Sequence, residues 1–266
     1  MPVYMGLDIG SLSCDGVVVD ERGQVLSWSV VPTGARNAEA IARARREVLE
    51  RAGVGEAEVA AVIATGYGRD RVEGRLASVT EITCHARGIR ALLPATDLLV
   101  DIGGQDSKAI RIERDGTVAD FAMNDKCAAG TGRFLEAMAR ALELSVEDLQ
   151  GLDAAAAGGV TLSSMCTVFA ETEVVSLVAD GAEVREIVRG LHDAIAARTN
   201  GLVRRVAPSL SGLHTAMSGG VAHNAGVVRA LSRALGCPIA VPDHPDTVGA
   251  LGAALIARER AGESRS

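Results

Sequence analysis

The sequence predicts an α/β protein made of two similar domains. Apolar runs of strand length alternate with helical patterns along the chain, which is typical of this fold class. Hydrophobic residues make up 48% of the 266 residues, which is ample for buried cores, and the scarcity of long polar runs excludes a disordered chain. The pattern that opens the chain also returns once, without a gap, further along.

Three strands are expected at the start of the chain, with a turn at Arg22 and Gly23 between the second and the third. A charged amphipathic helix, another strand and a second helix follow, and Pro94 marks a break. The expected strands span residues 3–9, 15–20, 24–31 and 59–65, and the expected helices span about 36–52 and 80–93.

Residues 97–123 repeat this opening pattern at a constant offset of 93 residues, which places Asp8 on Asp101. The alignment continues through three further pairs: Gly10 with Gly103, Val17 with Ile110, and Gly23 with Gly116. Each copy is a strand–turn–strand–turn–strand unit that begins with the same Asp-Ile-Gly turn. A duplication explains so many matches better than chance does, so we expect two similar domains that face one another.

The remainder of the chain is expected to be mostly helical, with helices over about 130–142, 145–156, 167–180 and 183–206. A short strand at 213–218 leads into Gly219 and Gly220, and a helix begins near 224. A last helix, over about 247–261, should pack back on the first domain. The expected division is residues 1–95 for the first domain and 96–245 for the second, with 246–266 returning to the first.

Charge and composition exclude several classes of function. The chain has 34 acidic and 27 basic residues, and its formal net charge of −7 argues against non-specific binding to nucleic acid. Only 2% of the residues are aromatic, too few for a base-stacking platform. No apolar run reaches the ~18–20 residues that cross a bilayer, and the opening residues lack a basic signal-peptide region. A soluble cytoplasmic protein is expected.

The two Asp-Ile-Gly turns are candidate phosphate loops, because backbone amides in such turns can face an anion. The first loop offers the amides and hydroxyls of Gly10, Ser11 and Ser13, and the second offers those of Gly103, Gly104 and Ser107. Asp8 and Asp101 would hold Mg²⁺ through water, and Gln105 and Asp106 could orient an attacking water. Either loop alone also suits an ordinary hairpin with a solvated Asp. As a symmetric pair, the loops favour a nucleotide clamp.

A third candidate element is Ser218-Gly219-Gly220-Val221, with Asn224 following at a helix start. Consecutive glycines after a strand let a flat ring lie against the backbone, which suits adenine. The alternative is a plain strand-to-helix turn in which Asn224 is the N-cap. Behind two phosphate loops, the element would complete a nucleotide site.

Several common catalytic motifs are missing from the sequence. It contains no G-x-x-x-x-G-K-[ST] loop, and its glycine clusters lack the spacing of a dinucleotide fingerprint. No His has zinc-ligand spacing to a second His or Cys, and there is no G-x-S-x-G elbow.

Five cysteines, at 14, 84, 127, 166 and 237, are poor material for a disulfide framework. Cys127 and Cys166 each precede a predicted helix, where the helix dipole and free amides would stabilise a thiolate. The small residues at 128–132 would let another chain or a large inorganic group come close. Two thiolates are too few for a [4Fe–4S] cluster, although a two-fold dimer would supply four. The alternative is a pair of half-buried cysteines that cap helices; Cys14, Cys84 and Cys237 are interpreted as core or surface thiols.

Seven segments together resemble the ATP-dependent activators of 2-hydroxyacyl-CoA dehydratases, and the likeness runs from about residue 3 to LGAAL at 251–255. Two of them, NDKCAAGTGRFLE at 124–136 and SSMCTVFAETEV at 163–174, are highly specific. The other five are LDIGS at 7–11, ATGYGR at 64–69, EITCHARG at 81–88, DIGGQDSK at 101–108 and SGGVAHNAGV at 218–227.

This resemblance implies the duplicated two-domain fold of actin, sugar kinases and heat-shock chaperones, with ATP between the domains. It also implies a homodimer with one [4Fe–4S] cluster held by Cys127 and Cys166 of both subunits. Members of the family pass one low-potential electron to a dehydratase component when ATP hydrolysis changes the angle between the cluster-bearing helices. A reduced ferredoxin or flavodoxin would be the electron donor. The helices after the two cysteines would be the levers.

One residue departs from the family pattern. The first loop usually carries Lys where this chain has Asp15, whereas the second loop keeps Lys108. A carboxylate near phosphates is unfavourable unless Mg²⁺ or distance offsets it, so nucleotide affinity or hydrolysis rate is expected to differ. The simplest alternative is that Asp15 points away along the strand.

Three other functions are compatible with the sequence. An ATPase subunit of a benzoyl-CoA-type reductase uses the same fold and cluster, and PDHPDT at 242–247 and HARG at 85–88 are similar to that branch. A sugar or N-acetylhexosamine kinase of the same superfamily would carry no iron. A non-catalytic nucleotide sensor or assembly factor is the third.

Overall fold

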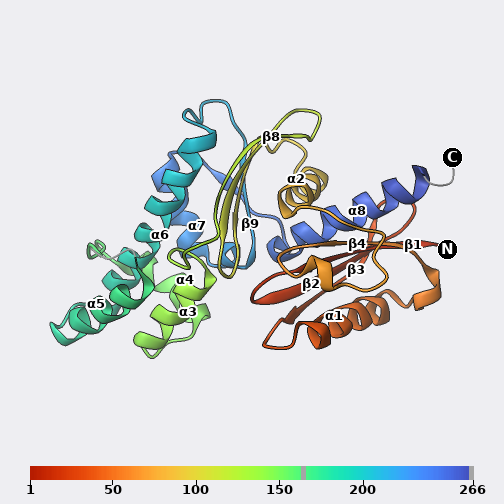
Figure 1. The fold of residues 1–266 in the computed structure, drawn as a ribbon. Helices are drawn as coiled ribbons and strands as arrows, with labels where there is room; N and C mark the ends of the chain where they lie inside the picture. Colours follow the sequence, from red (N-terminus) through yellow and green to blue (C-terminus); the bar gives the residue numbers. More distant parts are fainter. Residues whose placement is uncertain (163–165, 264–266) are drawn as a thin grey trace. The chain divides into compact units, whose positions relative to one another are not determined.

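The computed structural model describes residues 1–162 and 166–263 and divides the chain into two compact units (Figure 1). Unit 1 contains residues 1–97, 112–119 and the chain from 242 onward; unit 2 contains residues 98–111 and 120–241. Within the described residues, no helix is long and apolar enough to cross a membrane.

Unit 1 is built on a five-stranded mixed sheet with the order β3-β2-β1-β4-β5. The first three strands are antiparallel neighbours, whereas β4 runs parallel to β1 and β5 runs parallel to β4. The strands are β1 (Val3–Ile9), β2 (Ser13–Val19), β3 (Val25–Pro32), β4 (Val59–Thr65) and β5 (Ala77–Ser78).

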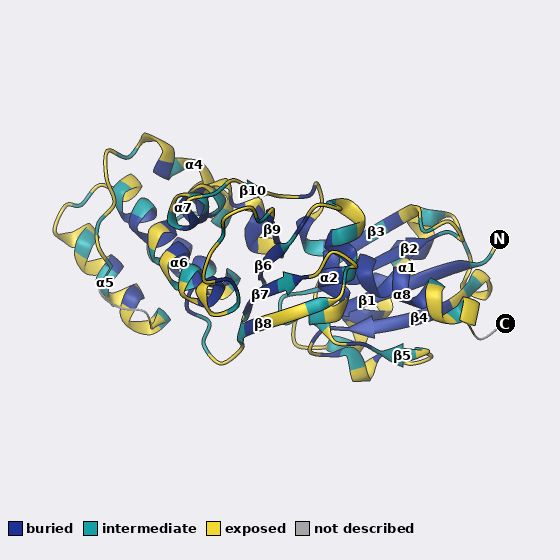
Figure 2. Cartoon of the chain, turned by 90° about the horizontal axis from the view of Figure 1, so that it is seen from above, coloured by how far each residue is buried: buried dark blue, intermediate teal, exposed yellow. Residues whose placement is uncertain are grey.

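Helices cover both faces of this sheet, so its central strands are buried on both sides (Figure 2). Because side chains alternate along a strand, Met5, Leu7 and Ile9 of β1 pack with one face and Tyr4 with the other. The first face is covered by α1 (Asn37–Ala52) and the second by α2 (Glu81–Leu92) and α8 (Val248–Glu263), with 3₁₀ turns η1 (Glu56–Glu58), η2 (Arg69–Arg71) and η5 (Pro245–Thr247) between elements.

Helices α2 and α8 approach so closely that only glycine fits at their crossing. A Cβ atom at Gly252 would collide with the carbonyl oxygen of Cys84, and one at Gly88 would collide with that of Val248. This contact places the start of α8 beside the end of β1, where Asp8 lies.

Unit 2 repeats the same sheet, in the order β8-β7-β6-β9-β10. As in unit 1, the first strand of the copy pairs antiparallel with the next strand in sequence and parallel with a later one. The strands are β6 (Leu98–Ile102), β7 (Ser107–Ile112), β8 (Val118–Asn124), β9 (Thr215–Ser218) and β10 (Ile239–Ala240). The duplication predicted from the Asp-Ile-Gly repeat is confirmed.

Helices inserted between β8 and β9 make unit 2 different from unit 1 (Figure 1). The apolar faces of these helices and of α7, which follows β9, form one core with the sheet, in which α6 packs with α7 and α3 packs with α5. The helical elements are α3 (Gly132–Ala141), α4 (Val146–Leu152), α5 (Thr167–Ala179), α6 (Val184–Val206) and α7 (Ala225–Leu235), with 3₁₀ turns η3 (Asp153–Ala155) and η4 (Gly220–His223).

Helix α5 is apolar but mostly exposed (Figure 2). Ala170 and Val174 face the core, whereas Val168 and Phe169 are 69% and 67% exposed and Val175 and Val178 are also exposed. Exposed apolar residues gathered on one element are typical of an interaction surface.

The expected elements exist, and most boundaries agree to within about two residues; two differences matter for the argument. The second strand begins at Ser13 rather than residue 15, so the first loop is shorter than predicted. The helix expected over 145–156 ends at Leu152 and continues as a 3₁₀ turn, because Gly151 weakens its last turn. The first three residues of the SSMCTVFAETEV segment and the last three of the chain lie outside the described residues.

Candidate functional site

The first loop joins β1 to β2 and is closed by its own backbone. The amide of Gly10 donates to the carbonyl of Ser13 at 2.9 Å, and the hydroxyl of Thr33 donates to the carbonyl of Gly10 at 2.9 Å. The expectation that the Gly10 amide is available to an anion is therefore wrong, because the turn uses it. Ser11 and Ser13 are half-buried in the same loop.

Asp8 lies at the end of β1, in a space that two glycines leave open. A Cβ atom at Gly66, just after β4, or at Gly249, in the first turn of α8, would collide with its carboxylate. Gly66 has φ 82°, a conformation that favours glycine. Asp8 is thus held between the end of β4 and the start of α8, and it is only 7% exposed.

Asp15 lies directly across from Asp8 in the β1–β2 register, so both side chains lie on the same face. It is 5% exposed, so it is buried beside Asp8 under the elements that cover this face of the sheet. Burial and the neighbouring Asp8 raise the pKa of Asp15 well above its usual value. The hydroxyl of Ser13 donates to Oδ2 at 3.0 Å, and Oδ1 has no hydrogen-bond partner among the described residues.

The second loop has the same turn as the first, but it contains a lysine, Lys108, where the first has an aspartate. The amide of Gly103 donates to the carbonyl of Asp106 at 3.0 Å, so this amide is also used by the turn, contrary to expectation. Nζ of the buried Lys108 lies 3.0 Å from Oδ2 of Asp101 and 2.5 Å from Oδ2 of Asp106. Of the remaining loop residues, Gln105 is exposed, Gly104 is half-buried and Ser107 is buried.

Hydrogen bonds join the second loop to the first turn of α3. The amides of Gly132 and Arg133 donate to the carbonyls of Gly103 and Gly104, each at 2.9 Å. The hydroxyl of Thr131, a fully buried residue, lies 2.9 Å from the carbonyl oxygen of Gly104 and 2.6 Å from that of Ala128. The loop carbonyls therefore take the amides that a helix start leaves without intrahelical partners.

The glycine element after β9 is adjacent to the second loop. The hydroxyl of Ser218 donates to Oδ1 of Asp101 at 2.7 Å, and Gly219, with φ 85°, leaves no room for a Cβ beside the carbonyl of Ile102. Asn224 is the N-cap of α7, because its Oδ1 accepts from the amides of Gly226 and Val227. Gly220 is exposed and Val221 is buried.

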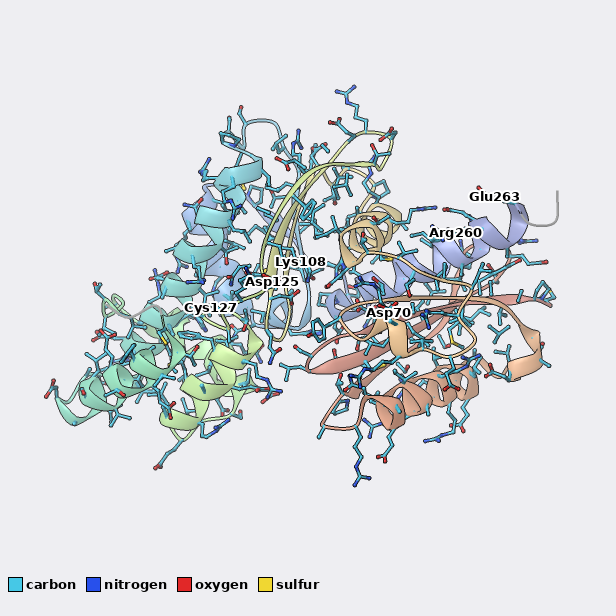
Figure 3. The ribbon with its side chains drawn as sticks, in the orientation of Figure 1. Asp70, Lys108, Asp125, Cys127, Arg260 and Glu263 are labelled. Atoms are coloured by element: carbon cyan, nitrogen blue, oxygen red, sulfur yellow. The ribbon has the colours of Figure 1, made fainter. Side chains whose placement is uncertain are left out.

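The two candidate ligand cysteines differ in their setting. Cys166 is exposed and is the N-cap residue of α5, as expected. Cys127 is half-buried and precedes α3, as expected, but it is not the residue at the helix start: Thr131 is the N-cap, and Cys127 lies four residues before it, in the segment between β8 and α3 (Figure 3). The side-chain amide of Asn124 donates to the carbonyl of Cys127 at 2.9 Å and holds this turn.

The other cysteines are structural or peripheral. Cys14 and Cys84 are fully buried, and burial raises the pKa of both thiols, that of Cys84 to about 12. Cys237 is half-buried beside Thr215. Their interpretation as core or surface thiols is confirmed.

A buried polar group behind α7 was not predicted. Nδ1 of His192 lies 3.6 Å from Oδ2 of Asp153, and Arg229 pairs with Oδ1 of the same carboxylate. Burial lowers the pKa of His192. Gly226 packs on the imidazole, where a Cβ would collide, so this group supports the start of α7 next to Asn224. A His within an amphipathic helical pattern gives no sequence signal of this role.

Thr131 was also missed, although it carried a signal. A Thr directly before a helix is a typical N-cap, but here the hydroxyl does not cap its own helix and instead contacts the second loop. Across the described residues, no group of three or more His, Cys, Asp or Glu side chains is placed to hold a metal ion.

The profile of the BadF/BadG/BcrA/BcrD ATPase family matches residues 5–257. The chain belongs to this family. A family relative, the activator of lactoyl-CoA dehydratase of Anaerotignum propionicum, is 42% identical over 259 residues, 97% of this chain and 98% of the relative. A subunit of the benzoyl-CoA reductase of Thauera aromatica is 30% identical over 264 residues, 96% of this chain and 93% of the relative.

Solved structures agree with this ATPase family and its fold. The activator of the 2-hydroxyisocaproyl-CoA dehydratase from Clostridium difficile, with bound ADPNP, superimposes with a TM-score of 0.92 at 39% identity, covering 99% of this chain and 97% of that one. A ROK family glucokinase from Streptomyces griseus superimposes with a TM-score of 0.59 at 16% identity, covering 97% of this chain and 99% of that one. The predicted actin-like, sugar-kinase-like fold is confirmed.

Proposed function

We propose that this chain is an ATP-hydrolysing activator that transfers one low-potential electron to a 2-hydroxyacyl-CoA dehydratase. One observation carries the proposal: the carbonyls of the second loop bind the start of α3, and α3 packs against α5, which begins directly after Cys166. A loop suited to phosphate is thereby connected to both cysteine-bearing segments. Relatives named as activators of such dehydratases support the same proposal.

The nucleotide, ATP or ADP with Mg²⁺, would be bound by the loops of each unit. Asp8 and Asp101 would hold Mg²⁺ through water, and Gln105, which is exposed, and Asp106 would orient the attacking water. Lys108 forms ion pairs with both Asp101 and Asp106 and offsets part of their negative charge, which would favour the approach of phosphate to the second loop.

The remaining residues would contact the nucleotide either as hydrogen-bond donors or by leaving room for it. Hydroxyls and amides near the loops would bind phosphate oxygens, and the glycine turn after β9 would accept adenine, with Asn224 fixing the start of α7. The amides of Gly10 and Gly103 are used in the turns, so these two glycines would contribute by letting the nucleotide approach the backbone closely. The residues concerned are Gly10, Ser11, Ser13, Gly103, Gly104, Ser107, Gly219, Gly220, Val221 and Asn224.

Cys127 and Cys166 would be the ligands of a [4Fe–4S] cluster shared by two copies of the chain. Two thiols per chain fit half of the four that such a cluster requires, and a two-fold dimer supplies the rest. The exposed Val168 and Phe169, which follow Cys166 on α5, suit burial against a second copy. When bound, the cluster supplies one-electron redox chemistry.

A movement of the second loop would be transmitted to the segments that contain Cys127 and Cys166. A shift of Gly103 and Gly104 would move the start of α3, because three hydrogen bonds join them. The partner dehydratase would carry out the elimination of water, and a reduced ferredoxin or flavodoxin would supply the electron. The protein is expected to act in the cytoplasm under anaerobic conditions.

Purification without oxygen tests this proposal. Iron, acid-labile sulfide and molecular mass are measured on the same sample, and about four iron and four sulfide per dimer are expected. Cys127→Ala and Cys166→Ala should lose the iron, whereas the control Cys237→Ala should retain it. Iron-free protein that still binds ATP under these conditions would refute the electron-transfer role and favour a sugar kinase, which sugar-dependent ATP consumption would identify.

An ATPase subunit of a benzoyl-CoA-type reductase is the second candidate, supported by the 30% identity to the reductase subunit of Thauera aromatica. Enzymes of this type use two unlike ATPase subunits, and this difference separates the two candidates. A stable homodimer that activates a dehydratase would exclude the reductase, and dependence on a second, different ATPase subunit would favour it.

A further inference from the structure

The duplication provides an internal comparison of the two loops. In both units the aspartate near the end of the first strand faces a residue of the second strand: Asp8 faces Asp15, and Asp101 faces Lys108. All four side chains are buried. The loops therefore share a backbone design and differ in the charge at one position.

In the second loop, the lysine satisfies the acids. Lys108 forms ion pairs with Asp101 and Asp106, and Ser218 donates a hydrogen bond to the other oxygen of Asp101. Buried carboxylates are stable only when they are paired or hydrogen-bonded in this way.

In the first loop, Asp15 takes the position of that lysine and has no comparable cation. The groups whose charges act on Asp15 are Asp8, Asp246 and His85, and no Lys or Arg of the described chain forms an ion pair with it. Ser13 donates to one carboxylate oxygen, and the other, Oδ1, is buried without a hydrogen-bond partner among the described residues. Two buried carboxylates face one another, and one oxygen of Asp15 lacks a donor.

We propose that Asp15 and Asp8 together bind a divalent cation in unit 1, taking the place that the lysine fills in unit 2. Mg²⁺ and Mn²⁺ suit the position, since Mg²⁺ binds through one or two carboxylates and keeps several waters. The two carboxylates come from neighbouring strands on a rigid sheet, so the site exists before any nucleotide binds.

This cation site has a consequence for the nucleotide, and that consequence rests on the proposed function. Phosphates can approach two carboxylates only when a cation neutralises them, whereas a lysine would attract phosphates without a metal. Nucleotide affinity should therefore depend strongly on the divalent cation, and Asp15 is the residue that sets this dependence.

The first experiment titrates Mn²⁺ into the nucleotide-free protein and follows the electron paramagnetic resonance signal of free Mn²⁺. Asp15→Asn keeps the shape and removes the charge, Asp15→Lys copies the second loop, and Asp243→Asn is an exposed control in the same unit. We expect one site in the wild type and the control, an affinity at least about tenfold weaker in Asp15→Asn, and no site in Asp15→Lys. Circular dichroism checks that each variant is folded.

The absence of bound Mn²⁺ in the wild type, or equal affinity in Asp15→Asn, would overturn the cation site. The second experiment measures ADP affinity by calorimetry in Mg²⁺ and in EDTA. The ADP affinity of the wild type should be about tenfold or more weaker in EDTA than in Mg²⁺, and that of Asp15→Lys less than about threefold weaker. Equal losses would refute the role of Asp15 in metal dependence. If Mn²⁺ binds through Asp15 but ADP binds under neither condition, the cation site stands and the proposed function fails.

Discussion

The hydroxyl of Thr131 lies between two carbonyl oxygens, 2.9 Å from that of Gly104 and 2.6 Å from that of Ala128. A hydroxyl has a single proton to donate, so at any moment it favours one of these acceptors. Gly104 belongs to the second loop, and Ala128 belongs to the turn that contains Cys127. Thr131 can thus exchange partners between the loop and the cysteine segment.

Thr131→Val should weaken the connection between nucleotide and Cys127. Valine keeps the shape but cannot donate, so one of the three hydrogen bonds between the second loop and the start of α3 is lost and the connection weakens, at a cost of about 1–3 kcal/mol in stability. The measurement is the alkylation rate of Cys127 in iron-free protein with and without ADP. A change caused by ADP in the wild type should shrink in Thr131→Val and persist in Thr117→Val, whose hydroxyl bonds only within an exposed turn. An unchanged ADP effect in Thr131→Val would contradict the connection.

The five cysteines should differ widely in reactivity. Cys166 is exposed, whereas Cys14 and Cys84 are fully buried and the pKa of Cys84 is raised to about 12. Because the thiolate is the reactive form, iodoacetamide at pH 8 should modify Cys166 in the native iron-free protein and leave Cys14 and Cys84 unmodified. Mass spectrometry of the alkylated peptides measures this, and urea should expose both buried thiols. Labelling of Cys84 at the rate of Cys166 would mean that α2 and α8 separate readily.

Asp15 should make stability decrease as the pH rises. Its folded-state pKa is raised above the unfolded value of about 3.9, so its stabilising contribution is fully present below that value and is lost as the pH rises toward the folded pKa. Urea unfolding in EDTA at several pH values measures the difference between the wild type and Asp15→Asn. This difference should fall with pH by up to about 1.4 kcal/mol per unit. A difference that does not vary above pH 4 would show that Asp15 is ionised without penalty.

His192 should have the opposite effect. Burial lowers its folded-state pKa below the unfolded value of about 6.5, so stability is retained above that value and is lost as the pH falls toward the folded pKa. Replacing the imidazole in His192→Gln should flatten the acid side of the stability profile while lowering stability at pH 8, because the group beneath Gly226 is disturbed. His214, which is exposed, provides the control as His214→Gln. If the stability of His192→Gln fell with decreasing pH as steeply as that of the wild type, His192 would be excluded as the cause of the loss of stability in acid.

The helices and strands could be predicted from the sequence, whereas the contacts between side chains of distant segments could not. The repeat that begins at Asp8 and Asp101 depends on alternation and turn chemistry, which are local, so the duplicated sheet was predictable. Alternation also places Asp15 on the face of Val17 and Val19, but only the structure shows that helices cover this face. The partner of Thr131 lies in another loop, and no local rule connects them.

Phe169 on α5 should be essential for dimer formation if two copies share a cluster. It is 67% exposed and lies three residues after Cys166, so a second copy would bury it. Phe169→Ser should shift the mass measured by light scattering from dimer to monomer and lower the iron content of anaerobically purified protein. Phe121→Ser is the matched control, since Phe121 is 52% exposed on β8 and away from α5 in the sequence. A Phe169→Ser protein that remains a dimer with full iron would place the interface elsewhere on the chain.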